Sequence, residues 1–187
     1  MNVLRLFARS LIRLIRLTWL SFKFPNLTIE PPSLIKYDDI GAIKMGDNVY
    51  IGAFSELIII KNSSYSSVDG KLTIGNRVVI GKGANIRAAG GEIVIGDACL
   101  LAQNVSLIAA NHLLDSSYYY RDQPWNPTRV GIIIGKNVWL GAGVIVLPGV
   151  EIGDSSVIAA GAVVTKPVPE NQIWAGVPAH FVRDVDL

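Results

Sequence analysis

The sequence predicts an all-β fold, a parallel β-helix in which short strands wind into stacked coils. From Ile134 onward every sixth residue is aliphatic, as at Ile134, Leu140 and Val146. The position four residues after each of these anchors is always small or narrowly branched: Val138, Val144, Val150, Ser156, Ala162 and Val168. A period of six fits neither an amphipathic helix nor a simple alternating strand, and it is typical of a hexapeptide β-helix.

Three six-residue units complete one coil of such a fold. Anchors eighteen residues apart therefore stack directly over one another, about 4.8 Å apart, and this stack forms the core. The corners between faces need backbone with positive φ, which Gly, Asn and Asp tolerate best. We expect the segments Gly135–Asn137 and Gly153–Asp154 to supply these corners.

Residues 1–24 are expected to form an amphipathic N-terminal helix. Four arginines spaced by four, four and three residues would line one stripe of it: Arg5, Arg9, Arg13 and Arg16. The other faces are apolar, but the longest gap between charges, from Arg16 to Lys23, is too short to span a bilayer. We therefore predict peripheral membrane contact through residues 2–24. The alternative is a helix that caps the β-helix or packs on a partner subunit.

Residues 25–187 are expected to form the β-helix domain. Pro25, Pro31 and Pro32 end the helix and indicate a short extended linker. Five triplets of anchors follow and predict about five coils, namely Met45, Ile51 and Leu57; Ile74, Ile80 and Ile86; Ile95, Leu101 and Leu107; Ile134, Leu140 and Val146; and Ile152, Ile158 and Val164. Where the steps between triplets exceed eighteen residues we expect ejected loops, near 61–71, near 89–91 and at 112–130. The short C-terminal tail should cover the open edge of the last coil.

Charge and cysteine content argue against several functions. The net charge is +2, but residues 1–29 hold five basic residues and no acid, so the remainder of the chain is acidic overall. This distribution does not indicate a nucleic-acid-binding surface. Cys99 is the only cysteine, which excludes an intrachain disulfide and a thiolate metal cluster within one chain. Its place in a small-residue position indicates a packing role.

His112 is the strongest candidate for chemistry. It stands at the root of the longest loop, beside Tyr118–Tyr120 and Trp125, whereas the other histidine, His180, lies in the tail. Imidazole can take a proton near neutral pH, so a histidine beside a long loop suits general base catalysis. The aromatic side chains suit the apolar faces of sugars, although they could equally fill a small core of the loop itself.

Several motifs add a family resemblance over residues 45–183. They are Asn111-His112, residues 134–141, residues 147–150, residues 159–166 and residues 175–179. Together they resemble the hexapeptide-repeat acetyltransferases, especially the galactoside, maltose and xenobiotic acetyltransferases and the polysaccharide O-acetyltransferases. The resemblance implies a left-handed coil and a homotrimer with sites between subunits. It also implies transfer of an acetyl group from acetyl-CoA, with no metal, to a hydroxyl of a sugar in surface polysaccharide or lipid-linked glycan biosynthesis.

The resemblance further implies roles for individual residues. His112 is the expected catalytic base. The expected acetyl-CoA-binding residues are Ala142, Ala160, Gly161, Thr165, Lys166 and Arg183, and the expected acceptor-binding residues are Asn85, Asn111 and Trp139. Leu113 stands where the family often has a proline after its histidine, so the acceptor identity is open. A cytoplasmic protein, peripheral on the inner face of the cell membrane, is expected.

Three other interpretations compete with this one. An N-acetyltransferase acting on a nucleotide-linked amino sugar would use the same base. A non-catalytic β-helix scaffold would need neither His112 nor the basic residues Lys166 and Arg183. The zinc-dependent carbonic anhydrases of the same fold need three histidines, and this chain has two.

Overall fold

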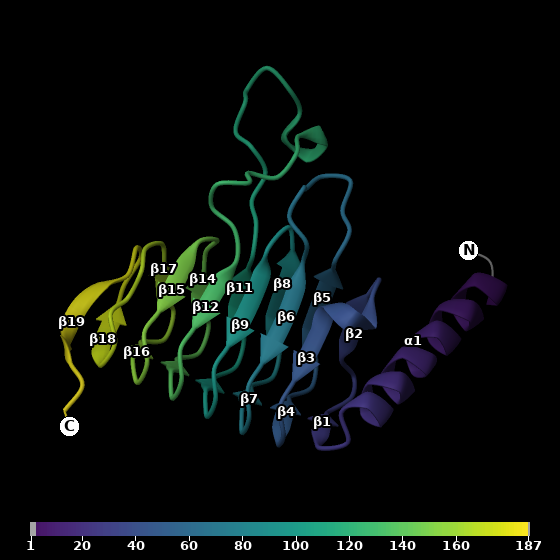
Figure 1. Ribbon diagram of the computed structural model, residues 1–187, viewed down its shortest axis with the longest axis horizontal. Helices are drawn as coiled ribbons and strands as arrows, with labels where there is room; N and C mark the ends of the chain where they lie inside the picture. The colour runs from purple at the N-terminus through teal and green to yellow at the C-terminus, as the bar shows by residue number, and fades with distance from the viewer. Residues whose placement is uncertain (1–2, 187) are drawn as a thin grey trace.

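Short strands stack into three sheets that wind around a common core, as Figure 1 shows. The first sheet runs β1 (Leu27–Ile29), β4 (Val49–Ile51), β7 (Val79–Ile80), β10 (Leu100–Leu101), β13 (Trp139–Leu140), β16 (Val157–Ile158), β18 (Gln172–Ala175) and β19 (His180–Asp184). The second runs β2 (Leu34–Tyr37), β5 (Glu56–Ile60), β8 (Asn85–Ala89), β11 (Ser106–Ile108), β14 (Ile145–Val146) and β17 (Val163–Val164). The third runs β3 (Ile43–Met45), β6 (Lys71–Ile74), β9 (Glu92–Ile95), β12 (Ile132–Ile134) and β15 (Val150–Ile152). This computed structural model describes residues 3–186, without the side chains of residues 3–9 and Arg13.

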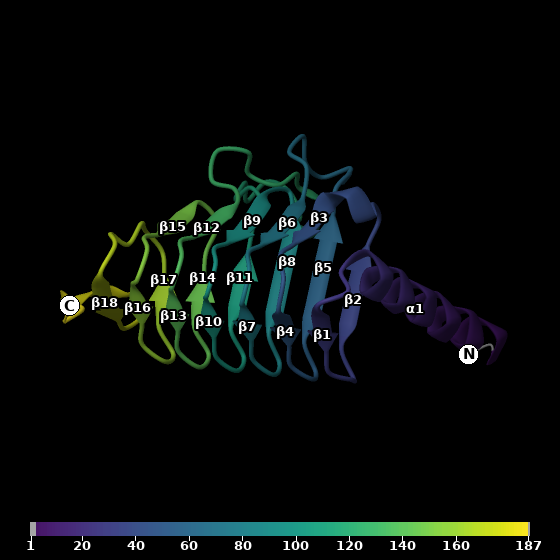
Figure 2. The same ribbon diagram turned by 60° about the horizontal axis from the view of Figure 1, so that its bottom comes forward.

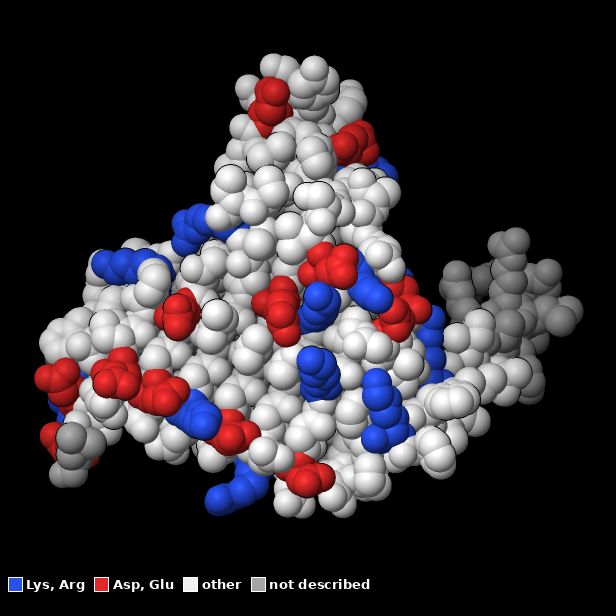
Figure 3. Space-filling view, in the orientation of Figure 1, with Lys and Arg blue, Asp and Glu red and all other residues white. Residues whose placement is uncertain are grey.

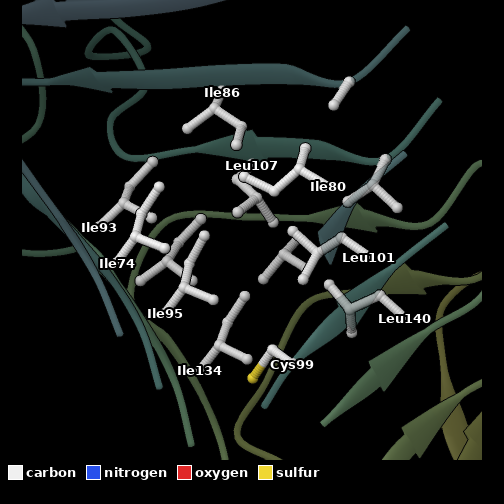
Figure 4. Packing of buried hydrophobic residues seen from close by; sticks show 14 of the residues in the cluster. Ile74, Ile80, Ile86, Ile93, Ile95, Cys99, Leu101, Leu107, Ile134 and Leu140 are labelled. Carbon is white, nitrogen blue, oxygen red and sulfur yellow. The ribbon is translucent and has the colours of Figure 1, made fainter. Parts of the chain in front are cut away.

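The core is the predicted stack of aliphatic anchors. Ile74, Ile95 and Ile134 are paired in register on neighbouring strands of the third sheet and are almost fully buried (Figure 4). The small positions between anchors are buried too, from Val138 to Val168. Cys99 occupies one of them, and burial raises the pKa of its thiol. The period of six is therefore confirmed as the pattern of the core.

The corner glycines have a different role from the expected one. In the two corners that contain Gly135 and Gly153, the residues with positive φ are Asn137 and Ser155, with φ of 56° at both. Gly135 and Gly153 are needed for another reason, because a Cβ on either would collide with the backbone of the next coil. Close stacking of coils, and not backbone handedness, requires glycine at these two positions.

The segment expected to be a linker is part of the β-helix. Strand β1 pairs with β4, and β2 pairs with β5, in both cases parallel. Ile29 lies in register with Ile51, and Ile35 with Leu57, so these two residues extend the stack of anchors by one strand on each sheet. Pro31 and Pro32 lie in the corner between β1 and β2. The linker interpretation was wrong because these prolines turn the chain within a coil.

Helix α1 (Val3–Lys23) closes the N-terminal end of the coils with its last turns. Leu20 is fully buried, and Leu17 and Phe24 pack against the same core cluster. The earlier turns lead away from the coils in both ribbon views (Figures 1 and 2). Of the expected arginine stripe, the side chains of Arg5, Arg9 and Arg13 lie outside the described residues. The guanidinium carbon of Arg16 lies 5.5 Å from the centre of the Tyr37 ring.

Other apolar side chains of α1 are exposed, including two in its last turns. Leu14, Trp19 and Phe22 are 63%, 59% and 83% exposed. In the described part of the chain, no helix combines the length and the apolar character needed to cross a membrane. On the face shown in Figure 3, acidic and basic side chains are intermixed along the coils.

All three insertions leave the coils at the same corner, between the second and third sheets. The segments are 61–70 after β5, Gly90–Gly91 after β8 and 109–131 after β11. Because these strands are neighbours in the second sheet, the insertions emerge side by side, and the two long ones rise together from the coils in Figure 1. At the far end, β18 continues the first sheet and β19 returns antiparallel to it, which covers the edge of β16.

Candidate active site

His112 is held by hydrogen bonds at both ring nitrogens. It follows β11 and forms an isolated antiparallel bridge with Trp125 across the base of the 109–131 loop. Its Nδ1 lies 2.8 Å from the carbonyl oxygen of Gln123, and its Nε2 lies 3.3 Å from the indole Nε1 of Trp125. A carbonyl can only accept and an indole N–H can only donate, so the two partners fit the tautomer with hydrogen on Nδ1. That tautomer leaves a lone pair on Nε2, which a base requires.

Gln123 also fixes the shape of the loop. It is a polar residue, yet only 5% of its surface is exposed. The side-chain Nε2 donates to the carbonyls of Asp115 and Tyr118 at 2.7 and 3.3 Å, and Oε1 accepts from the backbone N–H of Asp115 at 3.0 Å. One residue therefore closes the loop through its side chain and orients His112 through its carbonyl.

Trp125 is enclosed by parts of three successive coils. Its backbone N–H donates to the carbonyl of Tyr65 over 2.7 Å. The Tyr65 and Trp125 rings stack with centroids 6.2 Å apart and an interplanar angle of 23°. The benzene edge of the indole lies directly over Gly90, where an added Cβ would collide with the ring. The three neighbouring insertions thus build a single aromatic cluster around His112.

The 61–70 loop that carries Tyr65 is anchored at its root by two aspartates. Asp38 accepts hydrogen bonds from the backbone N–H groups of Lys61 and Asn62 at 2.8 and 3.0 Å. The ammonium group of Lys61 forms an ion pair with Asp39 over 2.7 Å. This hydrogen bond from Lys61 holds the pKa of Asp39 below its usual range.

A cleft of about 270 Å³ opens beside His112. Its walls are formed by Asn111, His112, Leu114, Asn126, Arg129, Leu147 and Pro148. The Nη2 of Arg129 donates to the carbonyl of Thr165 over 2.6 Å, and its side chain lies against Gly149. Arg129 therefore connects the cleft to the next corner along the coils. A volume near the lower end for ligand sites suits one small group, such as a single sugar hydroxyl and its ring.

Five of the expected cofactor residues lie at the two corners that flank the second sheet. Ala142, Ala160 and Gly161 lie at the corner that leads into it, and Gly161 donates a backbone hydrogen bond to Ala142 over 2.8 Å. Thr165 and Lys166 lie at the corner that leads out of it, on the same side as His112.

The two expected cationic residues make weak contacts in this chain. The Nζ of Lys166 lies 5.6 Å from the centre of the Trp174 ring. Arg183 lies in the exposed strand β19 and pairs with Asp186 over 2.8 Å. Both cations remain exposed to solvent, so their charges are available to a ligand.

Of the expected acceptor residues, one shares the cleft of His112. Asn111 lines it directly. Trp139 lies on the first sheet and is 51% exposed, away from the corner of His112. Asn85 begins β8 on the second sheet, and its buried Oδ1 has no hydrogen-bond partner. The chain by itself does not bring these three residues together.

The sequence did not point to Gln123, Tyr65 or Arg129. It placed Trp125 only among aromatic side chains that could contact a sugar or fill a small core of the loop. One signal in the sequence could have brought Tyr65 and Trp125 together. Both long insertions follow the last anchor of their triplet, so both leave the coils at the same corner. Among the described residues, no three His, Cys, Asp or Glu side chains are placed to hold a metal ion.

Comparison with known proteins identifies relatives of this chain. The family model described as bacterial transferase hexapeptide (six repeats) matches residues 131–166. Over 94 residues the chain is 40% identical to galactoside O-acetyltransferase of Escherichia coli strain K12, covering 50% of this chain and 45% of that protein. Over 127 residues it is 32% identical to the putative colanic acid biosynthesis acetyltransferase WcaF of the same strain, covering 68% and 66%. The matched chain thus spans about half to two thirds of these relatives.

Solved structures share the fold. A galactoside acetyltransferase in complex with coenzyme A superimposes with a TM-score of 0.57 at 28% identity, covering 91% of this chain and 70% of that chain. A mutant of AntD, an N-acyltransferase from Bacillus cereus, in complex with dTDP-4-amino-4,6-dideoxyglucose and coenzyme A, superimposes with a TM-score of 0.70 at 24% identity, covering 87% and 82%. The predicted left-handed parallel β-helix is confirmed.

Proposed function

Because this chain belongs to the hexapeptide-repeat family of bacterial transferases, we propose that it is an acetyl-CoA-dependent O-acetyltransferase that acts on a sugar hydroxyl. The observation that carries the proposal is the state of His112, with Nδ1 committed to the Gln123 carbonyl and the Nε2 lone pair beside a cleft. The relatives named for galactoside and colanic acid acetylation support a sugar acceptor in surface polysaccharide or lipid-linked glycan synthesis.

The role of His112 follows from its two nitrogens. Nε2 takes the proton of the acceptor hydroxyl as the oxygen attacks the thioester carbonyl, and later gives that proton to the departing sulfur. The Gln123 carbonyl keeps accepting from Nδ1–H throughout, which holds the ring in place and stabilises the imidazolium form. A positioned base of this kind contributes about 10² to 10⁴ in rate.

The residues at the two corners suit the long, thin shape of acetyl-CoA. A Cβ added at Gly161 would meet nothing within 4 Å, so the surface there is open to a ligand lying along the coils. The backbone at Ala142 and Ala160 can bond the amides of such a ligand. Lys166 and Arg183 supply positive charge for its phosphates. No metal is needed for this reaction.

We expect the complete site to form between copies in a homotrimer. The cleft of His112 lies at the corner where the second-sheet strands end. The small residues Ala142, Ala160 and Gly161 lie at the corner where these strands begin. A row of outward side chains on the first sheet is apolar and in register: Tyr50, Val79, Leu100, Trp139, Val157 and Ile173. Three copies related by cyclic symmetry would cover this row and give three equivalent sites.

The proposed location is the cytoplasmic face of the cell membrane, where acetyl-CoA and a lipid-linked acceptor meet. The exposed Leu14, Trp19 and Phe22 of α1 would lie in the headgroup region, which is how amphipathic helices bind.

Three substitutions test the proposed function. We expect His112→Ala to lower turnover about a hundredfold or more while acetyl-CoA binds with near-normal affinity. Lys166→Ala and Arg183→Ala should weaken acetyl-CoA binding with a smaller effect on turnover at saturation, since they contact groups whose charge does not change. Arg121→Ala, an exposed arginine outside the cleft, is the matched control.

Calorimetry for affinity and product mass spectrometry for transfer separate these effects. If His112→Ala keeps the wild-type turnover, His112 is not the catalytic base. Failure of the wild-type protein to bind acetyl-CoA would favour the non-catalytic scaffold. An amino sugar acceptor that gains the acetyl group on nitrogen would favour N-acetylation.

A further inference from the structure

The Nε2 atom of His112 is already occupied in this structure. The indole Nε1–H of Trp125 donates to it over 3.3 Å, while Nδ1 donates to the Gln123 carbonyl over 2.8 Å. The lone pair that a base would use therefore points at a side-chain donor of the same loop. Neither partner can reverse its role, because an indole nitrogen has no acceptor capacity and a carbonyl oxygen has no hydrogen.

The position of the Trp125 indole is determined by neighbouring coils. The ring stacks on Tyr65 and rests on Gly90, and its plane is nearly perpendicular to that of His112, at 84° with centroids 6.2 Å apart. An edge-on approach of this kind aims the N–H at Nε2. The contacts with Tyr65 and Gly90 favour this geometry. The hydrogen bond itself is long, at 3.3 Å, and is easily exchanged.

We propose that Trp125 is a positioning residue that caps the Nε2 of His112 until an acceptor hydroxyl replaces its indole N–H. This inference rests on the proposed function. An acceptor hydroxyl must donate to Nε2 before its proton can move, so it competes for the lone pair that Trp125 holds. Once Nε2 carries that proton it is a donor, and two donors cannot face each other. Trp125 therefore stays displaced until the proton has gone to the departing sulfur.

The cap has a chemical consequence when no acceptor is present. Water in the same position would give its proton to Nε2 and add its oxygen to the thioester carbonyl. The carbon–sulfur bond would then break, the proton would go to sulfur, and acetic acid and free coenzyme A would form. A capped Nε2 cannot activate water, so Trp125 favours transfer over this loss. A sugar replaces the cap more readily because the cleft can bind its ring as well as its hydroxyl.

Nitrogen NMR of the full-length protein tests the cap without any enzymatic activity. In ¹⁵N-labelled protein we expect His112 to show the Nδ1–H tautomer. Trp125→Phe, which keeps an aromatic ring over Gly90, should shift the Nε2 resonance of His112 and leave the exposed His180 unchanged. His112→Ala should shift the indole proton of Trp125 and not that of Trp19. If neither substitution moves its partner's resonance, the hydrogen bond does not exist in solution and the proposal is wrong.

A second measurement tests the effect on water. Release of coenzyme A from acetyl-CoA without acceptor should rise about threefold to tenfold in Trp125→Phe, the range for losing one neutral hydrogen bond. Trp19→Phe, which removes an exposed indole far from the cleft, should leave it unchanged. Hydrolysis that stays at the wild-type level in Trp125→Phe would show that Trp125 only fills space. If the wild-type protein transfers acetyl to no acceptor, the proposed function fails, and the nitrogen resonances still decide whether Trp125 occupies Nε2.

Discussion

Arg129 brings a guanidinium group to the cleft of His112 and connects two corners of the coils. It stands at the end of the 109–131 loop, lines the cleft, and reaches past Gly149 to the Thr165 carbonyl. It takes part in none of the ion pairs found among the described residues. Its remaining N–H groups are therefore free to serve a ligand, and its contact fixes the backbone beside Lys166.

We expect Arg129→Met to weaken acetyl-CoA binding by about tenfold or more, because the variant loses a charged donor next to the proposed cofactor residues Thr165 and Lys166. A hydrogen bond to a charged group contributes about 1.5–3 kcal/mol. Turnover at saturating acetyl-CoA should change less, because Arg129 is not the base. Isothermal calorimetry and steady-state kinetics measure the two quantities. Arg121→Met is the control of equal size in the same loop. Affinity that is unchanged in Arg129→Met would limit this residue to a role in packing.

At the scale of elements, the exposed tip of the 109–131 loop is closed by the side chain of Gln123. Most of its residues are exposed, including Tyr118, Tyr119 and Tyr120 at 68%, 81% and 54%. The Gln123 amide makes three hydrogen bonds within the loop, and its burial makes each one costly to lose. The coils do not depend on these bonds, because the loop lies outside the core.

Gln123→Ala should therefore loosen the loop and leave the fold intact. The Tyr118 carbonyl and the Asp115 N–H lose the hydrogen bonds from Gln123, at about 1–3 kcal/mol for each group that stays buried. The Asp115 carbonyl keeps only the hydrogen bond from the Tyr118 N–H. Hydrogen exchange in residues 113–124 should speed up about tenfold or more, turnover should fall, and the melting temperature should change little. Gln123→Glu keeps the acceptor for the Asp115 N–H, so its exchange rate should lie between those of the wild type and Gln123→Ala. Unaltered exchange in Gln123→Ala would contradict the assigned role.

Helix α1 carries both buried and exposed apolar side chains, which bears on how the proposed membrane contact should be tested. Leu20 belongs to the core, so removal of residues 1–24 would also open the first coil. Leu14 and Phe22 are exposed and make no such contribution. Substituting these two alone separates membrane contact from capping.

We expect the double variant Leu14→Gln, Phe22→Gln to bind anionic vesicles about tenfold more weakly or worse, since burial of each side chain contributes about 1.5–3 kcal/mol. Vesicle flotation measures the effect, and an unchanged melting temperature confirms that the cap is intact. Val177→Gln alters an equally exposed apolar residue at the opposite end of the coils and is the control. If the double variant and the wild type float equally well with the vesicles, α1 does not bind membranes through these residues and only caps the coils.

At the scale of the whole molecule, the first sheet presents a row of partly exposed apolar side chains. Val79, Leu100 and Trp139 are 39%, 44% and 51% exposed and lie in register on adjacent strands. Contiguous exposed apolar surface often marks a site of protein association, so we expect this row to face a partner copy.

We expect sedimentation equilibrium at micromolar concentration to give three times the 20.2 kDa mass of one chain. Leu100→Glu, which places a charge in the middle of the row, should shift the equilibrium toward smaller species and reduce turnover, because the site would lose its second copy. A wild-type monomer under these conditions would contradict both the trimer and the shared site.

The sequence by itself determined the core and the family of this protein. A repeat of six residues fixes which side chains point inward on every face, so the spacing alone was enough to stack Ile74, Ile95 and Ile134. The same spacing links Ile29 to Ile35, and this signal was obscured by the prolines between them. His112 could be selected from the sequence because it stands where the longest insertion begins, just after the anchor Leu107.

Only the tertiary structure decided what surrounds His112. Tyr65, Gly90 and Trp125 come from insertions of different length, which follow no period, and they meet because coils stack neighbouring corners within one strand spacing. The hydrogen bonds to Gln123 and Trp125 depend on how the 109–131 loop folds on itself, and hexapeptide spacing contains no information about that. The repeat fixes where each loop begins, and the packing of loop against loop fixes which atoms reach the base.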